Sequence, residues 1–117
     1  MSEIKDEDKK RLLSRVSPEN YFRVANGTVI KGLKELDNSL ENMGEETFRY
    51  HVNDYRNDFS TWIRDTIKDE ELADNLRKLK FKDGILKEIK YRIKFLERKI
   101  EKERVGLGMQ SQKWTNH

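Results

Sequence analysis

His51 is the residue of this sequence with the widest chemical range, since an imidazole can bind a metal or transfer a proton. Asp54 follows it by three residues, and Glu46 and Asp58 lie near it in the sequence. A histidine and a carboxylate one helical turn apart can share a cation. The second histidine is His117, and the chain has no cysteine, so the three or four regularly spaced ligands of a zinc site are missing. We therefore expect no metal and no cofactor, and we interpret His51 as a structural residue that bonds backbone or carboxylate.

Carboxylates between residues 54 and 71 are numerous enough for general acid–base catalysis. Such catalysis requires a pocket that shifts pKa values and holds a substrate. No pair of these acids is singled out by its spacing, and several fall where helices are expected to begin. The sequence also lacks a glycine-rich phosphate loop, a nucleophile elbow and a nucleotide-binding fingerprint. We therefore expect that the protein is not an enzyme.

Aromatic side chains lie among these acids between Phe48 and Trp62. Aromatic residues at helical spacing beside aliphatic ones usually pack in a core, although an exposed set could form a stacking platform. The spacing therefore predicts that Phe48, Tyr55, Phe59 and Trp62 are buried. Tyr50 falls off the inner stripe and is predicted to be the exception.

Charge is divided between two consecutive segments. Residues 34–76, the acidic body, contain twelve acids and five bases, whereas residues 77–104, the basic arm, contain twelve bases and five acids. Lys and Arg bind phosphate backbones through charge, and Phe81, Tyr91 and Phe95 could stack on exposed bases. The predicted nucleic-acid contacts are Lys80, Lys82, Lys87, Lys90, Lys94 and Arg98. The sequence leaves open that these charges only solvate the helix, or that the arm packs against the acidic body.

An apolar stripe runs along the same arm at alternating spacings of three and four residues. Its members are Leu86, Ile89, Ile93, Leu96 and Ile100. The stripe covers about two heptads, which is short for an autonomous coiled coil. It can pack on the chain's own helices or dock a partner, and a membrane-surface role fits less well. We predict that the stripe, together with Trp114, binds protein.

The elements around these residues predict a mainly α fold with an N-terminal β-hairpin and a long, basic C-terminal helix. Asn26 and Gly27, between aromatic and β-branched runs, are typical of a hairpin turn that accepts positive φ. Helical periodicity begins at Gly32 and is expected to stop at Gly44. Further helices are predicted at residues 45–54, from Asn57 or Asp58, from Asp69, and at residues 85–104 after a break at Asp83 and Gly84.

Length and composition indicate one domain with wide solvated faces, because 34% of the 117 residues are apolar and 40% are charged. We divide the chain into a charged N-terminal segment (1–16), a compact helical domain with the hairpin (17–79), a basic amphipathic helix (80–104) and a flexible tail (105–117). The N-terminus is charged, and no apolar run approaches the roughly 20 residues of a membrane span. A cytoplasmic location is therefore expected.

A more specific pattern comprises Tyr50-His51-Val52-Asn53, Asn57-Asp58-Phe59 and Trp62-Ile63, with Asp69 and Leu72-Ala73 after it. Tyr21-Phe22, Asn26-Gly27, Ile30, Leu33, Leu36 and Phe48 precede or complete it. Over residues 18–79 this pattern resembles a small domain of unknown function from uncharacterised archaeal and bacterial proteins. The resemblance implies a shared helical fold and brings no activity, cofactor or catalytic residue. It also implies a shared polar surface around Tyr50, His51, Asn53, Asn57 and Asp58.

Two functions follow from the sequence. The first is a non-enzymatic protein-binding or adaptor module whose C-terminal amphipathic helix docks a protein partner or forms a homo-oligomer. The alternative is a nucleic-acid or ribosome-associated protein that contacts phosphates through the basic arm. The apolar stripe supports the first function, and the charge of residues 77–104 supports the second.

Overall fold

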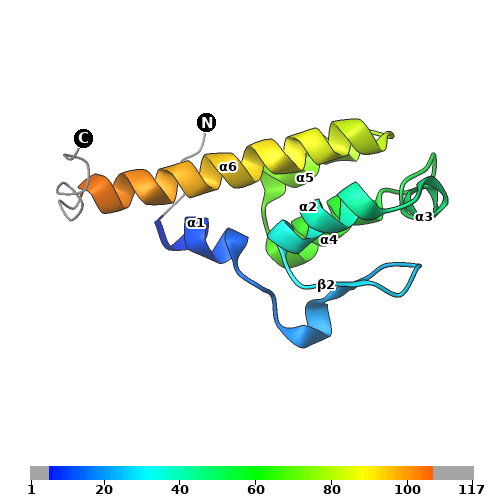
Figure 1. Ribbon diagram of the computed structural model, residues 1–117, viewed down its shortest axis with the longest axis horizontal. Coiled ribbons are helices and arrows are strands. Elements are labelled where there is room, and N and C mark those ends of the chain that lie inside the picture. Colours follow the sequence, from blue (N-terminus) through cyan, green and yellow to red (C-terminus); the bar gives the residue numbers. More distant parts are fainter. Residues whose placement is uncertain (1–5, 107–117) are drawn as a thin grey trace.

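The computed structural model describes residues 6–106, with side chains from 8 to 102, and confirms a mainly α fold with a small N-terminal hairpin and a long C-terminal helix (Figure 1). The elements are α1 (Asp6–Leu13), a 3₁₀ turn η1 (Pro18–Asn20), β1 (Phe22–Arg23), β2 (Val29–Ile30), α2 (Leu33–Asn42), α3 (Glu45–His51), α4 (Asp58–Trp62), a π-helical turn η2 (Ile63–Ile67), α5 (Glu70–Arg77) and α6 (Lys82–Gly106). Helix α6 runs along the longest dimension of the molecule, and the other elements lie along one side of it.

The hairpin is short, with two residues in each strand and a tight turn between them. Antiparallel pairing joins Phe22 to Ile30 and Arg23 to Val29. Val24 N–H then donates to Thr28 O at 2.8 Å, and Gly27 N–H donates to Val24 O at 2.8 Å. Gly27 has φ of +96° but Asn26 does not share the positive φ, so this turn uses the left-handed freedom of one of its two predicted residues.

Two glycines have different roles from those predicted. Helix α2 ends at Asn42 with Met43 as its cap, and Gly44 begins α3 at a φ of −70°, so Gly44 is not a left-handed helix stop. Gly84 lies inside α6, which starts at Lys82, so the predicted break at Asp83 and Gly84 is wrong. Asp83 suits the first turn of a helix because the helix dipole favours an acid there.

The predicted end of α3 is also wrong, because the helix stops at His51 rather than near Asp54. The side chain of Asn53 folds back, and its Nδ2 donates to Arg49 O at 2.9 Å and to Tyr50 O at 3.3 Å. These bonds satisfy carbonyls that a further helical turn would otherwise have used. The loop from residues 53 to 57 is thereby turned out of the helix axis.

The two predicted helix starts at Asn57 and Asp69 are confirmed by their side-chain caps. Asn57 Oδ1 accepts from Ser60 N–H at 3.0 Å, and Asp69 Oδ1 accepts from Leu72 N–H at 3.2 Å. Asn57 also donates from Nδ2 to Leu76 O at 3.0 Å, which joins the start of α4 to the end of α5. One polar side chain therefore satisfies two helix ends at once.

A single core includes residues from both ends of the described chain. Leu12 of α1 and Ile89 of α6 belong to the same buried cluster as Phe48 and Phe59, and Trp62 is 8% exposed. Phe48, Phe59 and Trp62 are thus buried as predicted. The prediction for Tyr55 is wrong, because α3 ends at His51 and Tyr55 lies in the following loop, 94% exposed. Because α1 and α6 contribute to the cluster, the core extends beyond residues 17–79.

Helix α6 packs on the acidic body and is held there by ion pairs as well as apolar contacts. Arg92 donates to both carboxylate oxygens of Asp69, at 2.7 and 2.9 Å, and the two side chains are 11% and 2% exposed. Nearer the surface, Lys34 lies 3.0 Å from Glu97. The basic arm therefore packs back on the acidic body, which is one of the possibilities that the sequence leaves open.

Lys90 makes one of these contacts dependent on pH. Its ammonium lies 3.0 Å from Asp37 and 3.1 Å from Glu41, and these contacts, with Asp37 first, raise the pKa of Lys90 above its ordinary value of 10.5. Because the pKa is higher in the folded state, the stabilisation is present in full below the unfolded pKa and is lost as pH rises through the folded one. We expect Lys90→Gln to unfold at lower urea concentration than the wild type at pH 7, with the gap narrowing at pH 11. A gap that stays constant across this range would contradict the assignment.

Candidate functional site

The apolar stripe of α6 is largely covered by the chain itself. Ile89 and Leu96 are fully buried and Ile93 is 8% exposed, all within the core cluster. Leu86 and Ile100, at the edges of the stripe, are half-buried. Trp114, predicted to act with them, lies outside the described residues. In this conformation the stripe stabilises the packing of α6 and offers little apolar area to a partner.

Half of the cations predicted to bind nucleic acid have contacts inside the chain. Lys82 donates to Met43 O at 2.7 Å, and Lys80 lies 3.6 Å from Asp54. Lys90 forms ion pairs with Asp37 and Glu41. The other three are Lys87, Lys94 and Arg98, for which the described side chains provide no carboxylate within ion-pair distance.

Two of these three, Lys94 and Arg98, belong to an exposed face of α6 away from its buried stripe, and Lys87 lies outside this face. This basic–aromatic face lines a groove with a volume of about 520 Å³ and consists of Tyr91, Lys94, Phe95, Arg98, Lys99 and Lys102. Its members recur at spacings of three and four residues, which places them along one side of a helix. Of these six described residues, four are cations and none is an acid. Lys99 and Lys102 were not among the predicted contacts, although their spacing from Lys94 and Arg98 could have revealed them.

The two aromatic rings of this face differ in how available they are. Tyr91 is 68% exposed. Phe95 is half-buried, and its ring centroid lies 5.4 Å from the Arg92 guanidinium and 5.4 Å from the Lys99 ammonium. Cations near a ring face hold it by cation–π attraction. The Phe95 ring is therefore held between two cations, whereas the Tyr91 ring is open to solvent.

A nearby carboxylate that could weaken this field is engaged elsewhere. Glu97 lies on α6 between the basic residues, but its carboxylate lies 3.0 Å from the ammonium of Lys34 on α2. Since this pair forms on the flank that packs toward α2, it neutralises Glu97 without involving the exposed cations. The face therefore keeps the positive charge of Lys94, Arg98, Lys99 and Lys102.

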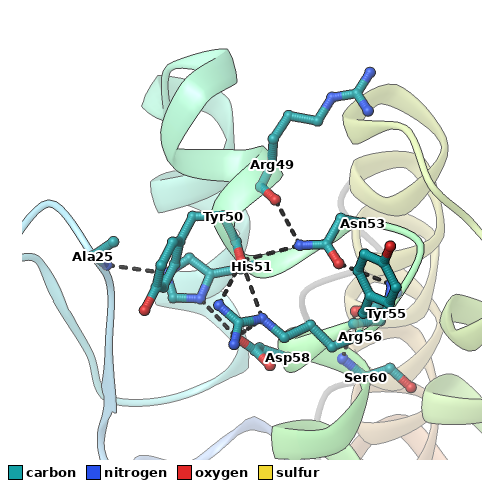
Figure 2. A network of polar contacts seen from close by, with 10 residues as sticks. Ala25, Arg49, Tyr50, His51, Asn53, Tyr55, Arg56, Asp58 and Ser60 are labelled. Atoms are coloured by element: carbon teal, nitrogen blue, oxygen red, sulfur yellow. Dashed lines mark hydrogen bonds and ion pairs between the residues drawn. The ribbon is translucent and has the colours of Figure 1, made fainter.

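His51 bonds a backbone group and a carboxylate, as its structural interpretation expects (Figure 2). The side chain is almost fully buried, its Nε2 accepts from Ala25 N–H at 3.0 Å, and its Nδ1 lies 2.9 Å from Asp58 Oδ2. Because Nε2 is an acceptor, the ring proton of a neutral imidazole lies on Nδ1 and is donated to Asp58. Both ring nitrogens thus join the hairpin turn to α3 and α4. Among the side chains that the structure describes, residues 8–102, no three of His, Asp or Glu are grouped closely enough to hold a metal ion.

The remaining residues of the predicted polar surface surround the same network. Arg56 donates from Nε and Nη2 to Tyr50 O at 3.1 and 2.7 Å, and its guanidinium lies 4.6 Å from the Tyr50 ring centroid. Asn53 and Asn57 form the caps described above, so the five predicted residues are brought together in one region. Tyr50 is 56% exposed, as its position off the inner stripe predicts. Most of this surface is used to shape the loop from residues 53 to 57.

No helix within residues 6–106 has both the length and the apolar character that crossing a bilayer would demand. No curated protein and no solved structure gives a significant match to the chain. A family model does match, over residues 15–114, which includes α6 and is longer than the region of resemblance found in the sequence. The resemblance to a domain of unknown function is thereby confirmed, and the chain belongs to the family described as Family of unknown function (DUF5752).

Proposed function

We propose that this protein is a non-enzymatic binding module that contacts single-stranded nucleic acid through the basic–aromatic face of α6. The observation that carries the proposal is the run of unpaired cations along this face, Lys94, Arg98 and Lys102, with the exposed ring of Tyr91 beside it. Cations attract the phosphate backbone, and an exposed aromatic ring can stack on a base that is not paired. A grooved, positively charged surface with aromatic side chains is typical of proteins that bind single strands.

A protein-docking role for the apolar stripe has less support from the geometry. Docking through Ile89 and Leu96 would require α6 to leave the core, because both are fully buried in the chain. That movement would also separate Arg92 from Asp69 and leave charge in an apolar interior. The exposed face of α6 requires no such rearrangement. We therefore favour the alternative function of the basic arm over the adaptor function.

The test is the binding of fluorescein-labelled 20-mer oligouridylate and oligothymidylate, followed by anisotropy at 50 and 200 mM salt. We expect the triple variant Lys94→Gln, Arg98→Gln, Lys102→Gln to bind at least tenfold more weakly than the wild type. A plot of its log affinity against log salt should also be less steep, with a slope smaller in magnitude by about 2, since each of the three lost phosphate contacts on a single strand contributes ~0.7. Tyr91→Ala should weaken binding at both salt concentrations, because stacking depends little on charge.

A matched control removes the same charges elsewhere. Arg23→Gln, Lys68→Gln, Lys78→Gln also replaces one arginine and two lysines, at exposed positions on other elements. We expect this variant to bind nearly as well as the wild type. Absence of binding at 50 mM salt, or an equal loss in both triple variants, would overturn the proposal.

A further inference from the structure

A second cavity lies beside the loop that follows α3. Figure 1 shows that loop at the opposite end of the molecule from the C-terminal end of α6. We call this cavity the polar pocket, and its volume is about 240 Å³. Its lining residues come from the loop, from α4 and η2, and from the end of α5 and the segment after it. Neither the resemblance nor the family match assigns a ligand to it.

The polar pocket gathers cations although it lies mainly within the acidic body. Among the described residues of its lining, Arg56, Arg64, Arg77 and Lys80 are cations and Asp54 is an acid. Three further carboxylates lie within ion-pair distance of the arginines, so an anion meets this positive charge only where those pairs are weak. Arg56 and Arg64 come from different elements than Arg77 and Lys80, so this concentration arises from the fold and is not evident from the sequence.

Three of these cations have acid partners that are weakly held. Arg64 lies 3.4 Å from Asp65, Arg77 lies 3.9 Å from Asp74, and Lys80 lies 3.6 Å from Asp54, with carboxylate side chains that are 62%, 68% and 83% exposed. Ion pairs this exposed contribute little, about 0–1 kcal/mol. An anion in the pocket can therefore compete for the cations without a large loss.

The two arginines are also suited to a planar or tetrahedral oxyanion. The closest contacts of Arg64 and Arg77 with their carboxylates are made through Nε. Within the described part of the chain, the terminal guanidinium nitrogens of these two residues make no hydrogen bond. Paired N–H groups of arginine bind phosphate oxygens in a bidentate fashion. Arg56, by contrast, is fixed by its two bonds to Tyr50 O and by Asp58 at 3.5 Å, and it forms a rigid wall.

Polar groups deeper in the pocket are already satisfied and narrow the choice of ligand. Ser60 donates from Oγ to Ala73 O at 2.8 Å, and Asn57 uses both ends of its amide as a cap. Among the described residues of the lining, the neutral groups left for a ligand are the hydroxyls of Tyr55 and Thr61. Recognition then depends on charge and on guanidinium geometry, which favours a small, highly charged oxyanion.

We propose that the polar pocket binds a phosphate dianion, either inorganic phosphate or a phosphate monoester on a larger molecule. Arg64 and Arg77 supply the guanidinium contacts, and Lys80 adds positive charge. The site does not depend on the basic–aromatic face, since the two share no residue.

The proposal is tested by following ¹⁵N–¹H amide shifts of the full chain during titration with inorganic phosphate, with phosphoserine and with chloride at matched ionic strength. We expect saturable one-to-one shifts for the phosphate ligands, centred on residues 53–57, 61–64 and 77–80, and no saturation with chloride. Tighter binding of phosphoserine than of inorganic phosphate would identify a phosphorylated molecule as the ligand, and the reverse order would identify free phosphate.

The double variant Arg64→Gln, Arg77→Gln should reduce phosphate affinity at least tenfold. The matched control Arg15→Gln, Arg23→Gln removes two exposed arginines outside the pocket and should leave the affinity unchanged. The triple variant of α6 should also bind phosphate normally, so a failure of the nucleic-acid proposal would not affect this result. Equal weakening by the double variant and its control, or shifts that never saturate, would overturn the phosphate site.

Discussion

Replacing Asp69 by alanine is expected to lower the free energy of unfolding by about 3–5 kcal/mol, measured by urea denaturation at pH 7. The substitution leaves the Arg92 guanidinium in a site where it is 11% exposed and has lost both of its short hydrogen bonds. It also removes the cap that accepts from Leu72 N–H at the start of α5. A domain of this size has a total stability of roughly 5–15 kcal/mol, so the variant should lie close to unfolding at room temperature.

Two further variants test this expectation: one is a control at an exposed carboxylate, and the other removes the buried charge of Arg92. Asp65→Ala removes an exposed carboxylate from the same part of the chain and should change stability by no more than about 0.5 kcal/mol. Combining Asp69→Ala with Arg92→Met should recover part of the loss, since the second substitution removes a buried charge whose remaining carboxylate, Glu71 at 3.6 Å, is 65% exposed and stabilises it little. A double variant less stable than Asp69→Ala alone would contradict this account.

Truncating Phe59 to alanine is expected to cost about 3–5 kcal/mol of unfolding free energy. Its side chain is fully buried, and its ring centroid lies 5.1 Å from that of Phe22 and 6.3 Å from that of Phe48. The cavity would open where the hairpin, α3 and α4 meet. Thermal or urea unfolding measures the effect.

Tyr55 provides the comparison for Phe59, because it is an aromatic residue from the same segment and is 94% exposed. Tyr55→Ala should shift the unfolding midpoint little, by about 0.5 kcal/mol or less. If the two truncations had similar effects, the assignment of Phe59 to the core and of Tyr55 to the surface would be wrong.

The sequence predicts the elements whose signals are local. The apolar period of α2 and the caps at Asn57 and Asp69 depend on neighbouring residues, and each is found where it was expected. The end of α3 depends on the folded-back amide of Asn53, which a periodic pattern does not reveal. The start of α6 at Lys82 likewise differs, because a glycine at position 84 was interpreted as a break although it is accommodated within the helix.

The candidate sites were harder to predict because they depend on which surfaces the fold covers. Ile89 and Leu96 have the spacing of a docking stripe and of a core stripe alike, and their burial selects the core. Arg92 appeared to be one more cation of the basic arm, whereas its partner Asp69 lies 23 residues away and is buried with it. Arg64 forms a surface ion pair with its neighbour Asp65. Its place in the polar pocket depends on Arg77 and Lys80, which no sequence spacing relates to it.

The packing of α1 against α6 has a consequence for the order in which the protein can fold during synthesis. Leu12 is made early and Leu96 late, yet both belong to one core cluster, and their two helices are in contact. A ribosome-bound nascent chain that has not yet released α6 therefore exposes the apolar sides of α1 and α2. Contacts between residues distant in sequence form slowly, and exposed apolar surface invites aggregation in the meantime. The core is therefore completed only once α6 is available to pack against α1 and α2.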